Sequence, residues 1–287
     1  MTKILLTGTT GFLGYEFLKS IIDEKKYNII DIIRSDKKKL KNLRNKNKNY
    51  TSIKFHSYDD LKKKLMNKKF DMFINFATNY KNSHEIDDIK PMIESNIYFP
   101  NLILELLAPK LKKFITFGSI MEFNNSTNYK PKNYYSSTKK AFEDILDFYK
   151  LKYSSCKFLI IKFHDTFGDQ DNRKKLLPTI IKSVNSNIKF QILNKNLKLN
   201  VISTTSINCF IKQLIDKNNS YSKILLKNKK NLNIYSLLKK IAKKKGSKLN
   251  FKISNKPVNF LNSKSIKNHK IIFLNDDIEK LVLKKII

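Results

Sequence analysis

Short apolar runs alternate with longer amphipathic segments through the first 163 residues of the chain. The segments at 12–23, 60–66, 92–107 and 136–153 carry apolar residues at helical spacing, whereas 37–48 is a charged surface segment. This alternation predicts an α/β fold with a doubly wound parallel sheet and right-handed crossovers. Ligands of such sheets bind at the carboxyl ends of the strands. The apolar runs of strand length lie at 4–6, 29–33, 52–55, 72–77, 114–117 and 158–161.

The pattern loosens after residue 164. We expect the first domain to cover residues 1–163 and a smaller mixed α/β lobe, partly interleaved with the sheet, to cover residues 164–287. Gly246 follows one of the helical segments of this lobe and is expected to cap it. Helical spacing predicts further helices at 176–184, 205–217, 234–245 and 276–283.

Three of the six glycines lie close together, directly after the apolar run 4–6. They are Gly8, Gly11 and Gly14. A strand that turns through spaced glycines into a helix brings the backbone close to a dinucleotide pyrophosphate, because no Cβ stands in the way. The spacing alone also fits an ordinary glycine-rich turn, so it predicts a phosphate site only together with other motifs.

The charge of the chain raises the question of nucleic-acid binding. Its formal net charge is +34, from 58 Lys and Arg against 24 Asp and Glu. Only three of the basic residues are arginines, Arg34, Arg44 and Arg173, and the lysines are dispersed along the chain. Arginine is the preferred side chain for base edges and bidentate phosphate contacts, so this pattern argues against specific nucleic-acid binding. Attraction of small anionic substrates is expected.

The sequence also bears on the cellular compartment. No window approaches the roughly 18–20 consecutive apolar residues of a membrane helix, and the N-terminal apolar run is too short for a secretory signal. Cys156 and Cys209 lie far apart without metal or redox spacing, which favours two reduced, buried thiols. We therefore expect a cytosolic protein with no membrane insertion and no metal site.

A second constellation lies near the start of the long helix expected from residue 136. Tyr135 and Lys139 are four positions apart, which places the phenol and the ammonium on one helix face. A nearby ammonium lowers the pKa of a phenol and makes it a usable proton donor or acceptor. Ser119 follows the apolar run 114–117, so its hydroxyl is expected at the carboxyl edge of the sheet.

Together these motifs resemble the extended short-chain dehydrogenase/reductase family, the NAD-dependent epimerases and dehydratases with a Rossmann-type domain. The resemblance covers essentially the whole chain. Its further motifs are the segment 75–78, which resembles the strand lining the cofactor; Asn96, where the family carries a helix asparagine; and the segment 162–168, which resembles the family's Arg-x-x-Asn-x-Tyr-Gly.

The resemblance implies a role for each catalytic residue. Tyr135 would be the general acid/base, Lys139 would hold the nicotinamide ribose, and Ser119 would hydrogen-bond the reacting oxygen. The plainer alternative is that Ser119 caps its strand and Tyr135 packs on the sheet. The implied cofactor contacts are Gly8, Thr10, Gly11, Phe12, Leu13, Gly14, Ala77, Thr78, Lys139 and Phe163; the implied substrate contacts are Asn79, Ser119, Asp165 and Lys175.

The choice of cofactor depends on the end of the second strand, where NAD-binding members carry an acid and NADP-binding members a basic residue. Here the strand ends in Arg34 and Ser35, while Asp31 lies in mid-strand. A guanidinium suits a phosphate, so NADP(H) is favoured over NAD(H). Asp59 is a candidate for the adenine amine, with its neighbours Tyr58 and Asp60 as alternatives.

Three reactions of the family compete. Sugar 4,6-dehydratases carry an Asp-Glu pair directly after the active-site hydroxyl, where this chain has Ile120 and Met121, with Glu122 one place too late. C4 epimerases keep NAD bound and usually have an acidic second-strand tip, unlike Arg34 here.

The expected reaction is therefore reduction by NADPH. The stretches 77–80 and 133–140 are similar to nucleotide-sugar 4-ketoreductases of the CDP-abequose and paratose synthase type, which implies reduction of a nucleotide-linked 4-keto-6-deoxyhexose for surface polysaccharide. Asp165 departs from the family asparagine, which leaves open a non-catalytic dinucleotide-binding protein. A nucleotide-sugar C4 epimerase with bound NAD is the other alternative. A homodimer is compatible with the sequence.

Overall fold

The central element is a parallel sheet. The computed structural model describes residues 1–286 except 170, 218–219 and 256–265, and the described strands form an eight-stranded sheet in the order β14-β11-β6-β5-β4-β1-β2-β3. All seven neighbouring pairs are parallel, and the strand order reverses between β1 and β4. The strands are β1 (Thr2–Thr7), β2 (Tyr27–Ile33), β3 (Tyr50–Lys54), β4 (Met72–Asn75), β5 (Lys113–Phe117), β6 (Lys157–Phe163), β11 (Lys223–Asn228) and β14 (Lys270–Leu274).

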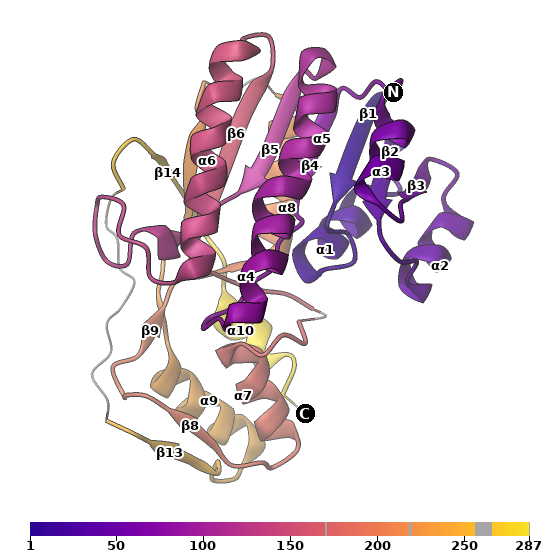
Figure 1. The fold of residues 1–287 in the computed structure, drawn as a ribbon. Helices are drawn as coiled ribbons and strands as arrows, with labels where there is room; N and C mark the ends of the chain where they lie inside the picture. Colours follow the sequence, from indigo (N-terminus) through magenta and orange to yellow (C-terminus); the bar gives the residue numbers. More distant parts are fainter. Residues whose placement is uncertain (170, 218–219, 256–265, 287) are drawn as a thin grey trace.

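Helices cover both faces of this sheet, as Figure 1 shows. Alternate residues of a strand point to opposite faces, so Ile4 and Leu6 of β1 enter one core while Leu5 enters the other. This arrangement confirms the predicted doubly wound α/β fold. One core packs against α1 (Phe12–Ile21), α2 (Lys38–Lys46) and α8 (Thr204–Asp216); the other packs against α3 (Tyr58–Leu65), α5 (Phe99–Leu107) and α6 (Tyr134–Lys152).

The second part of the chain builds a lobe beyond the carboxyl ends of the strands (Figure 1). The lobe has its own apolar core, to which Leu177, Ile234 and Val282 belong. The segment after residue 163 is not confined to it, because β11, β14 and α8 return to the sheet. Its elements are α7 (Leu176–Asn185), α9 (Ile234–Lys245), α10 (Ile278–Leu283) and the pairs β7 (Asp165–Phe167) with β10 (Val201–Ser203), β8 (Phe190–Ile192) with β13 (Phe251–Ile253), and β9 (Lys198–Leu199) with β12 (Leu232–Asn233).

Two elements differ from the expected bounds. The helix expected to begin after Pro91 begins earlier, as α4 (Ile86–Ile93), and contains that proline. Proline removes one backbone donor but need not end a helix, and here the chain continues into a π-helical turn, η1 (Glu94–Tyr98), before α5. The charged segment 37–48 contains α2. Gly246 does cap α9, in the left-handed conformation at φ +63°.

None of the described helices is both long and apolar enough to cross a bilayer.

Candidate active site

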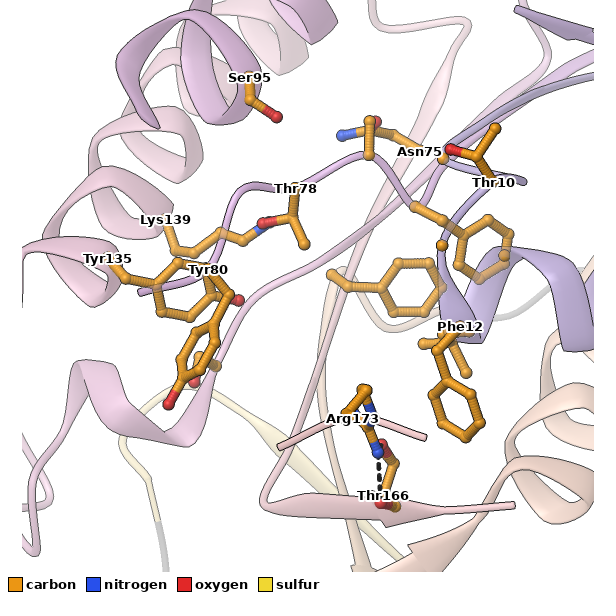
Figure 2. Close-up of a pocket in the computed structure, with 18 of the residues that line it drawn as sticks. Thr10, Phe12, Asn75, Thr78, Tyr80, Ser95, Tyr135, Lys139, Thr166 and Arg173 are labelled. Carbon is orange, nitrogen blue, oxygen red and sulfur yellow. Dashed lines mark hydrogen bonds between the residues drawn. The ribbon is translucent and has the colours of Figure 1, made fainter. Parts of the chain in front are cut away.

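A cavity of about 790 Å³ opens between the carboxyl edge of the sheet and the lobe. Most of the predicted site residues line it, and Figure 2 shows Thr10 and Phe12 on one side with Tyr135 and Lys139 on the other. Asp59 and Asn79 are not among the lining residues. The predicted residues that the structure brings together are Gly8, Thr10, Gly11, Phe12, Leu13, Gly14, Arg34, Ser35, Ala77, Thr78, Ser119, Tyr135, Lys139, Phe163, Asp165 and Lys175.

The glycine turn that joins β1 to α1 forms one wall of the cavity. Gly8 has φ +74°, and a Cβ there would lie 2.4 Å from the carbonyl carbon of Phe76. A Cβ on Gly14 would lie 2.4 Å from the carbonyl oxygen of Gly8. Gly11, the N-cap of α1, provides no side-chain cap, and the first turn of α1 lines the cavity. The first backbone N–H groups of a helix have no partner within the helix. This geometry suits a phosphate.

Buried polar side chains tie together the strand ends beneath the cavity. Thr7 Oγ1 donates to Asn75 Oδ1 at 2.6 Å, and Asn75 Nδ2 donates to Thr116 Oγ1 at 3.2 Å. This chain of hydrogen bonds links β1, β4 and β5 at the point where strand order reverses. It satisfies groups that would be costly to bury alone, and it fixes the floor of the site.

Asn96 joins the loop after β4 to the helix that carries Tyr135. Its Oδ1 accepts from Asn79 N at 2.7 Å and from Thr78 Oγ1 at 3.1 Å. Its Nδ2 donates to Thr138 Oγ1 at 2.9 Å and to Asn79 O at 3.0 Å. The π-helical turn η1 carries this buried amide. Asn79 is therefore placed as a structural partner of Asn96 rather than in the cavity wall.

Ser119, Tyr135 and Lys139 meet at the other side of the cavity. Ser119 Oγ accepts from Met121 N at 3.1 Å, which leaves its hydroxyl proton available for a ligand. Lys139 Nζ lies 5.8 Å from the ring centroid of Tyr135. Tyr80, which the sequence reasoning did not assign to the site, packs edge-to-face on Tyr135 with ring centroids 4.9 Å apart (Figure 2).

The pKa of Tyr135 differs from the one expected for a phenol close to an ammonium. Burial raises the pKa of Tyr135, with Glu122 and Tyr80 adding to the rise and the Thr78 hydroxyl opposing it. Burial lowers the pKa of Lys139 to about 8, with Glu122 opposing and Lys162 adding to the shift. The pKa of Tyr135 is therefore raised rather than lowered, because desolvation of the phenol is the largest effect on it and Lys139 is not among the groups that shift it. Near neutral pH this site holds a protonated phenol beside an ammonium.

The tip of β2 forms the far end of the cavity. The Arg34 guanidinium lies 5.8 Å from the ring centroid of Phe55 and 5.9 Å from that of Phe99. Its Nη2 donates to Tyr58 Oη at 2.9 Å. Asp31 is fully buried in mid-strand, where its Oδ2 accepts from Thr9 Oγ1 at 2.6 Å. No carboxylate of β2 therefore reaches this end.

Two acids near this tip have other partners. Asp36 pairs with Arg44. Asp59 pairs with Lys62, at 3.0 Å, and its side chain is 81% exposed. Asp59 thus points to solvent on α3, while its neighbour Tyr58 takes the position beside Arg34.

The lobe contributes charged residues to the wall opposite the sheet. Lys175 Nζ lies 4.0 Å from Asp165 Oδ1 and 4.6 Å from the ring centroid of Tyr80. Arg173 stacks on Phe12 with its guanidinium carbon 4.1 Å from the ring centroid, and its Nη2 donates to Thr166 O at 2.7 Å (Figure 2). Arg173 was not predicted as a site residue, although an arginine in so lysine-rich a chain is a usable signal.

The sequence of this chain is similar to those of proteins that act on nucleotide sugars. The sequence profile of the NAD dependent epimerase/dehydratase family matches residues 4–199. A CDP-abequose synthase from Yersinia pseudotuberculosis is 30% identical over 202 residues, which are 70% of this chain and 68% of that protein. A second CDP-abequose synthase, from Salmonella muenchen, is 26% identical over 64% of this chain and 60% of its own length.

Solved structures share the fold. A UDP-N-acetylglucosamine 4-epimerase from Methanobrevibacter ruminantium aligns with a TM-score of 0.79 at 18% identity over 99% of this chain and 96% of that one. A UDP-glucuronic acid 4-epimerase from Bacillus cereus, solved with NAD, aligns with a TM-score of 0.75 at 15% identity over 99% of this chain and 91% of that one. With the glycine turn, the Ser119, Tyr135 and Lys139 set and the family match in place, the chain belongs to the NAD dependent epimerase/dehydratase family of extended short-chain dehydrogenases/reductases.

Proposed function

We propose that this protein uses NADPH to reduce the 4-keto group of a nucleotide-linked 6-deoxyhexose, in the cytosol, for surface polysaccharide. The observation that carries the proposal is the meeting of Ser119, Tyr135 and Lys139 at one side of a cavity whose other side is the glycine turn. The curated relatives named CDP-abequose synthase support the substrate class. The lysines of the lobe suit a diphosphate, because they bring positive charge to the wall opposite the sheet.

The residues divide the work of ketone reduction. A bound nicotinamide dinucleotide supplies the hydride. The Ser119 hydroxyl donates a hydrogen bond to the ketone oxygen, and Tyr135, held protonated by its raised pKa, gives that oxygen its proton. Lys139, an ammonium below its pKa of about 8, stabilises the phenolate that remains and hydrogen-bonds the ribose.

The position of Glu122 favours this reaction over dehydration. Glu122 Oε1 accepts from the backbone N–H of Ser119 at 2.6 Å, and its other oxygen pairs with Lys162 beneath the cavity. Met121 lines the cavity in its place. Elimination of water needs an acid and a base beside the sugar. Glu122, the carboxylate nearest in sequence to Ser119, is not among the residues that line the cavity.

Arg34 supports NADPH over NADH. It stands at the tip of β2, where a 2′-phosphate would lie, and its exposed guanidinium is held by aromatic rings rather than by a carboxylate. A planar guanidinium binds phosphate oxygens in a bidentate manner.

A panel of ketosugars tests the proposal. CDP-, dTDP- and GDP-linked 4-keto-6-deoxyhexoses are added to the protein with NADPH, and absorbance at the reduced nicotinamide band is followed. We expect oxidation of NADPH with at least one of them. Tyr135→Phe removes the proton donor and should lower kcat by about 10³-fold with little change in NADPH affinity. Tyr149→Phe, at a tyrosine outside the cavity, is the matched control.

The two alternative functions predict other results. A C4 epimerase would co-purify with NAD and interconvert C4 isomers without net oxidation. A non-catalytic binding protein would be stabilised by NADPH without turning over any ketosugar. Turnover failing across the whole panel would overturn the reductase.

A further inference from the structure

A cluster of buried charges lies directly beneath the catalytic side of the cavity. Lys162 and Glu122 are fully buried, and Glu143 is 5% exposed. Lys162 Nζ lies 2.6 Å from Glu143 Oε2 and also pairs with Glu122 Oε2. Lys223 completes the cluster from β11, with its Nζ 2.8 Å from Glu143 Oε1. The family assignment and the proposed mechanism give none of these side chains a role.

The cluster connects the two elements that carry the catalytic groups. Glu122 ends the short 3-10 helix η3 (Ile120–Glu122), and its Oε1 accepts from the backbone N–H of Ser119 at 2.6 Å. Glu143 lies on α6 one turn after Lys139 and two turns after Tyr135, so all three occupy one helix face. Lys162, from β6, joins the two carboxylates. The position of Ser119 relative to α6 is therefore set through one ion cluster.

Stability alone is a weak explanation for such a cluster. Removing ions from water carries a desolvation cost that their mutual attraction often fails to exceed, and apolar side chains of similar size would hold the same elements together as well. What apolar residues could not provide is charge. Burial raises the pKa of Glu122 and Glu143 adds to the rise, whereas Lys162 and the Ser119 N–H favour the carboxylate form. Glu122 is the acid whose charge acts on both catalytic groups: it raises the pKa of Lys139 and that of Tyr135.

We propose that Glu122 is a positioning residue of the active site, which holds the Ser119 backbone N–H and, through Lys162, ties it to the face of α6 that carries Tyr135 and Lys139. The negative charge of Glu122 also favours the ammonium form of Lys139. What that ammonium does rests on the proposed function, whereas its protonation does not. Titratable groups come close to the cluster from each element packed against it, and all are buried or half-buried. They are Tyr135, Lys139 and Glu143 of α6, Lys162 of β6, Lys223 of β11, and His269. His269 packs edge-to-face on Phe123.

The charge balance gives the sign of the effect. Around Lys139, Glu122 is the carboxylate that favours the charged amine, and Lys162 is the cation that opposes it. Removing the charge of Glu122 takes away the carboxylate that raises the pKa of Lys139, while Lys162, still paired with Glu143, continues to lower it. We therefore expect the pKa of Lys139 to fall further below its ordinary value. Removing Glu143 takes away a carboxylate that is not among the groups that shift the pKa of Lys139, although it too is buried and paired with Lys162.

Glu122→Gln is the sharpest variant, because it keeps the size of the side chain and an acceptor for the Ser119 N–H while removing the charge. Glu143→Gln is the matched control. The readout is the pH dependence of acetylation of Lys139 by acetic anhydride in the ligand-free protein, followed by peptide mass spectrometry. The wild-type midpoint is expected near the pKa of about 8. It should fall by about one pH unit in Glu122→Gln and stay within about 0.3 unit in Glu143→Gln.

A second variant keeps the test decisive if Glu122→Gln does not fold. The double variant Glu122→Gln with Lys162→Met removes one charge of each sign, leaves Glu143 paired with Lys223, and should return the midpoint to within about 0.3 unit of wild type. Circular dichroism checks the fold of each variant.

The kinetic counterpart is the pH profile of kcat with the ketosugar. In Glu122→Gln its alkaline limb should move down by the same one unit, with about five- to sixfold loss of kcat at pH 8 and little change in KM for NADPH. Equal midpoint shifts in Glu122→Gln and Glu143→Gln, or none in either, would overturn the inference. Absence of ketosugar turnover in the wild type would overturn the proposed function alone, because the labelling result stands without turnover.

Discussion

The two sides of the cavity offer a ligand different kinds of contact, one from the backbone and one from side chains. On the side of the sheet, the glycine turn presents backbone N–H groups at a helix start, and the close packing of Gly8 on Phe76 leaves no room for a side chain. On the side of the lobe, the wall consists of long side chains such as Arg173 and Lys175, which come from loops. A backbone site tolerates almost no substitution, whereas a wall of separate side chains loses affinity gradually as single residues change. Asp171 and Thr166 hold Arg173 in that wall, while the contact of Lys175 with Asp165 is longer, at 4.0 Å. Substitutions on the two sides should therefore differ in the size of their effects.

Gly8→Ala should have the largest effect. Its Cβ would meet the Phe76 carbonyl carbon at 2.4 Å, and the residue would stay in the left-handed region at φ +74°. The turn must move away from the position that suits a phosphate, so we expect NADPH affinity to fall by at least about 100-fold and stability by about 3 kcal/mol or more. Fluorescence titration with NADPH and urea unfolding measure the two quantities.

Gly246→Ala is the matched control in the lobe. Gly246 has a similar φ of +63°, but a Cβ there would meet nothing within 4 Å. It should cost about 1 kcal/mol and leave NADPH binding unchanged. Equal losses of cofactor affinity in the two variants would show that the tight packing of the glycine turn is not what matters.

Lys139→Met should separate activity from stability. Burial holds the pKa of Lys139 at about 8 against an ordinary 10.5, so the native state disfavours the charge. The neutral variant should be more stable by about 2–3 kcal/mol at pH 7 and lose about 10³-fold in kcat. Thermal melts at pH 7 and ketosugar kinetics measure these effects.

The stability gain of Lys139→Met should depend on pH. Between pH 8 and 10.5 the unfolded wild type binds the Lys139 proton and the native state does not, so wild-type stability gains from this residue as pH rises. The advantage of Lys139→Met should therefore shrink across that window and vanish above it. An advantage that is constant with pH would contradict a buried ammonium.

The same contrast explains how far the sequence could predict this molecule. The glycine turn, Ser119 and the Tyr135 and Lys139 pair depend on local spacing, and the structure brings all of them to one cavity. The sequence did not identify Arg173 as a site residue, because its partner Phe12 lies far away in sequence.

The fold shows the same limit. The sequence predicted that the segment after residue 163 is partly interleaved with the sheet, but it did not identify β11 and β14 as the strands that return, because parallel pairing across the lobe has no local signature. The raised pKa of Tyr135 also needed the structure, since a spacing of four places an ammonium on the same helix face but does not reveal the burial that raises the pKa.

Arg34→Ala tests side-chain recognition within the sheet side. Loss of a charged hydrogen-bonding partner for a phosphate costs about 1.5–3 kcal/mol, so NADPH affinity should fall about 10–100-fold while NADH affinity changes less than about threefold. Arg34→Lys keeps the charge but not the planar fork, and should recover only part of the loss. If NADPH and NADH affinities fell together, Arg34 would be acting through its packing on Phe55 and Phe99 instead.

Lys175→Gln should have the smallest effect, as expected for one flexible cation on the lobe side. Lys175 is half-buried beside Asp165 and Tyr80, where its ammonium can reach an anionic substrate. Its loss should raise the KM for the ketosugar about tenfold, with kcat and NADPH affinity unchanged, and the effect should diminish at higher ionic strength. Lys182→Gln removes the same charge from α7 at an exposed position outside the cavity. A comparable rise in KM in this control would show that net charge, rather than the position of Lys175, attracts the substrate.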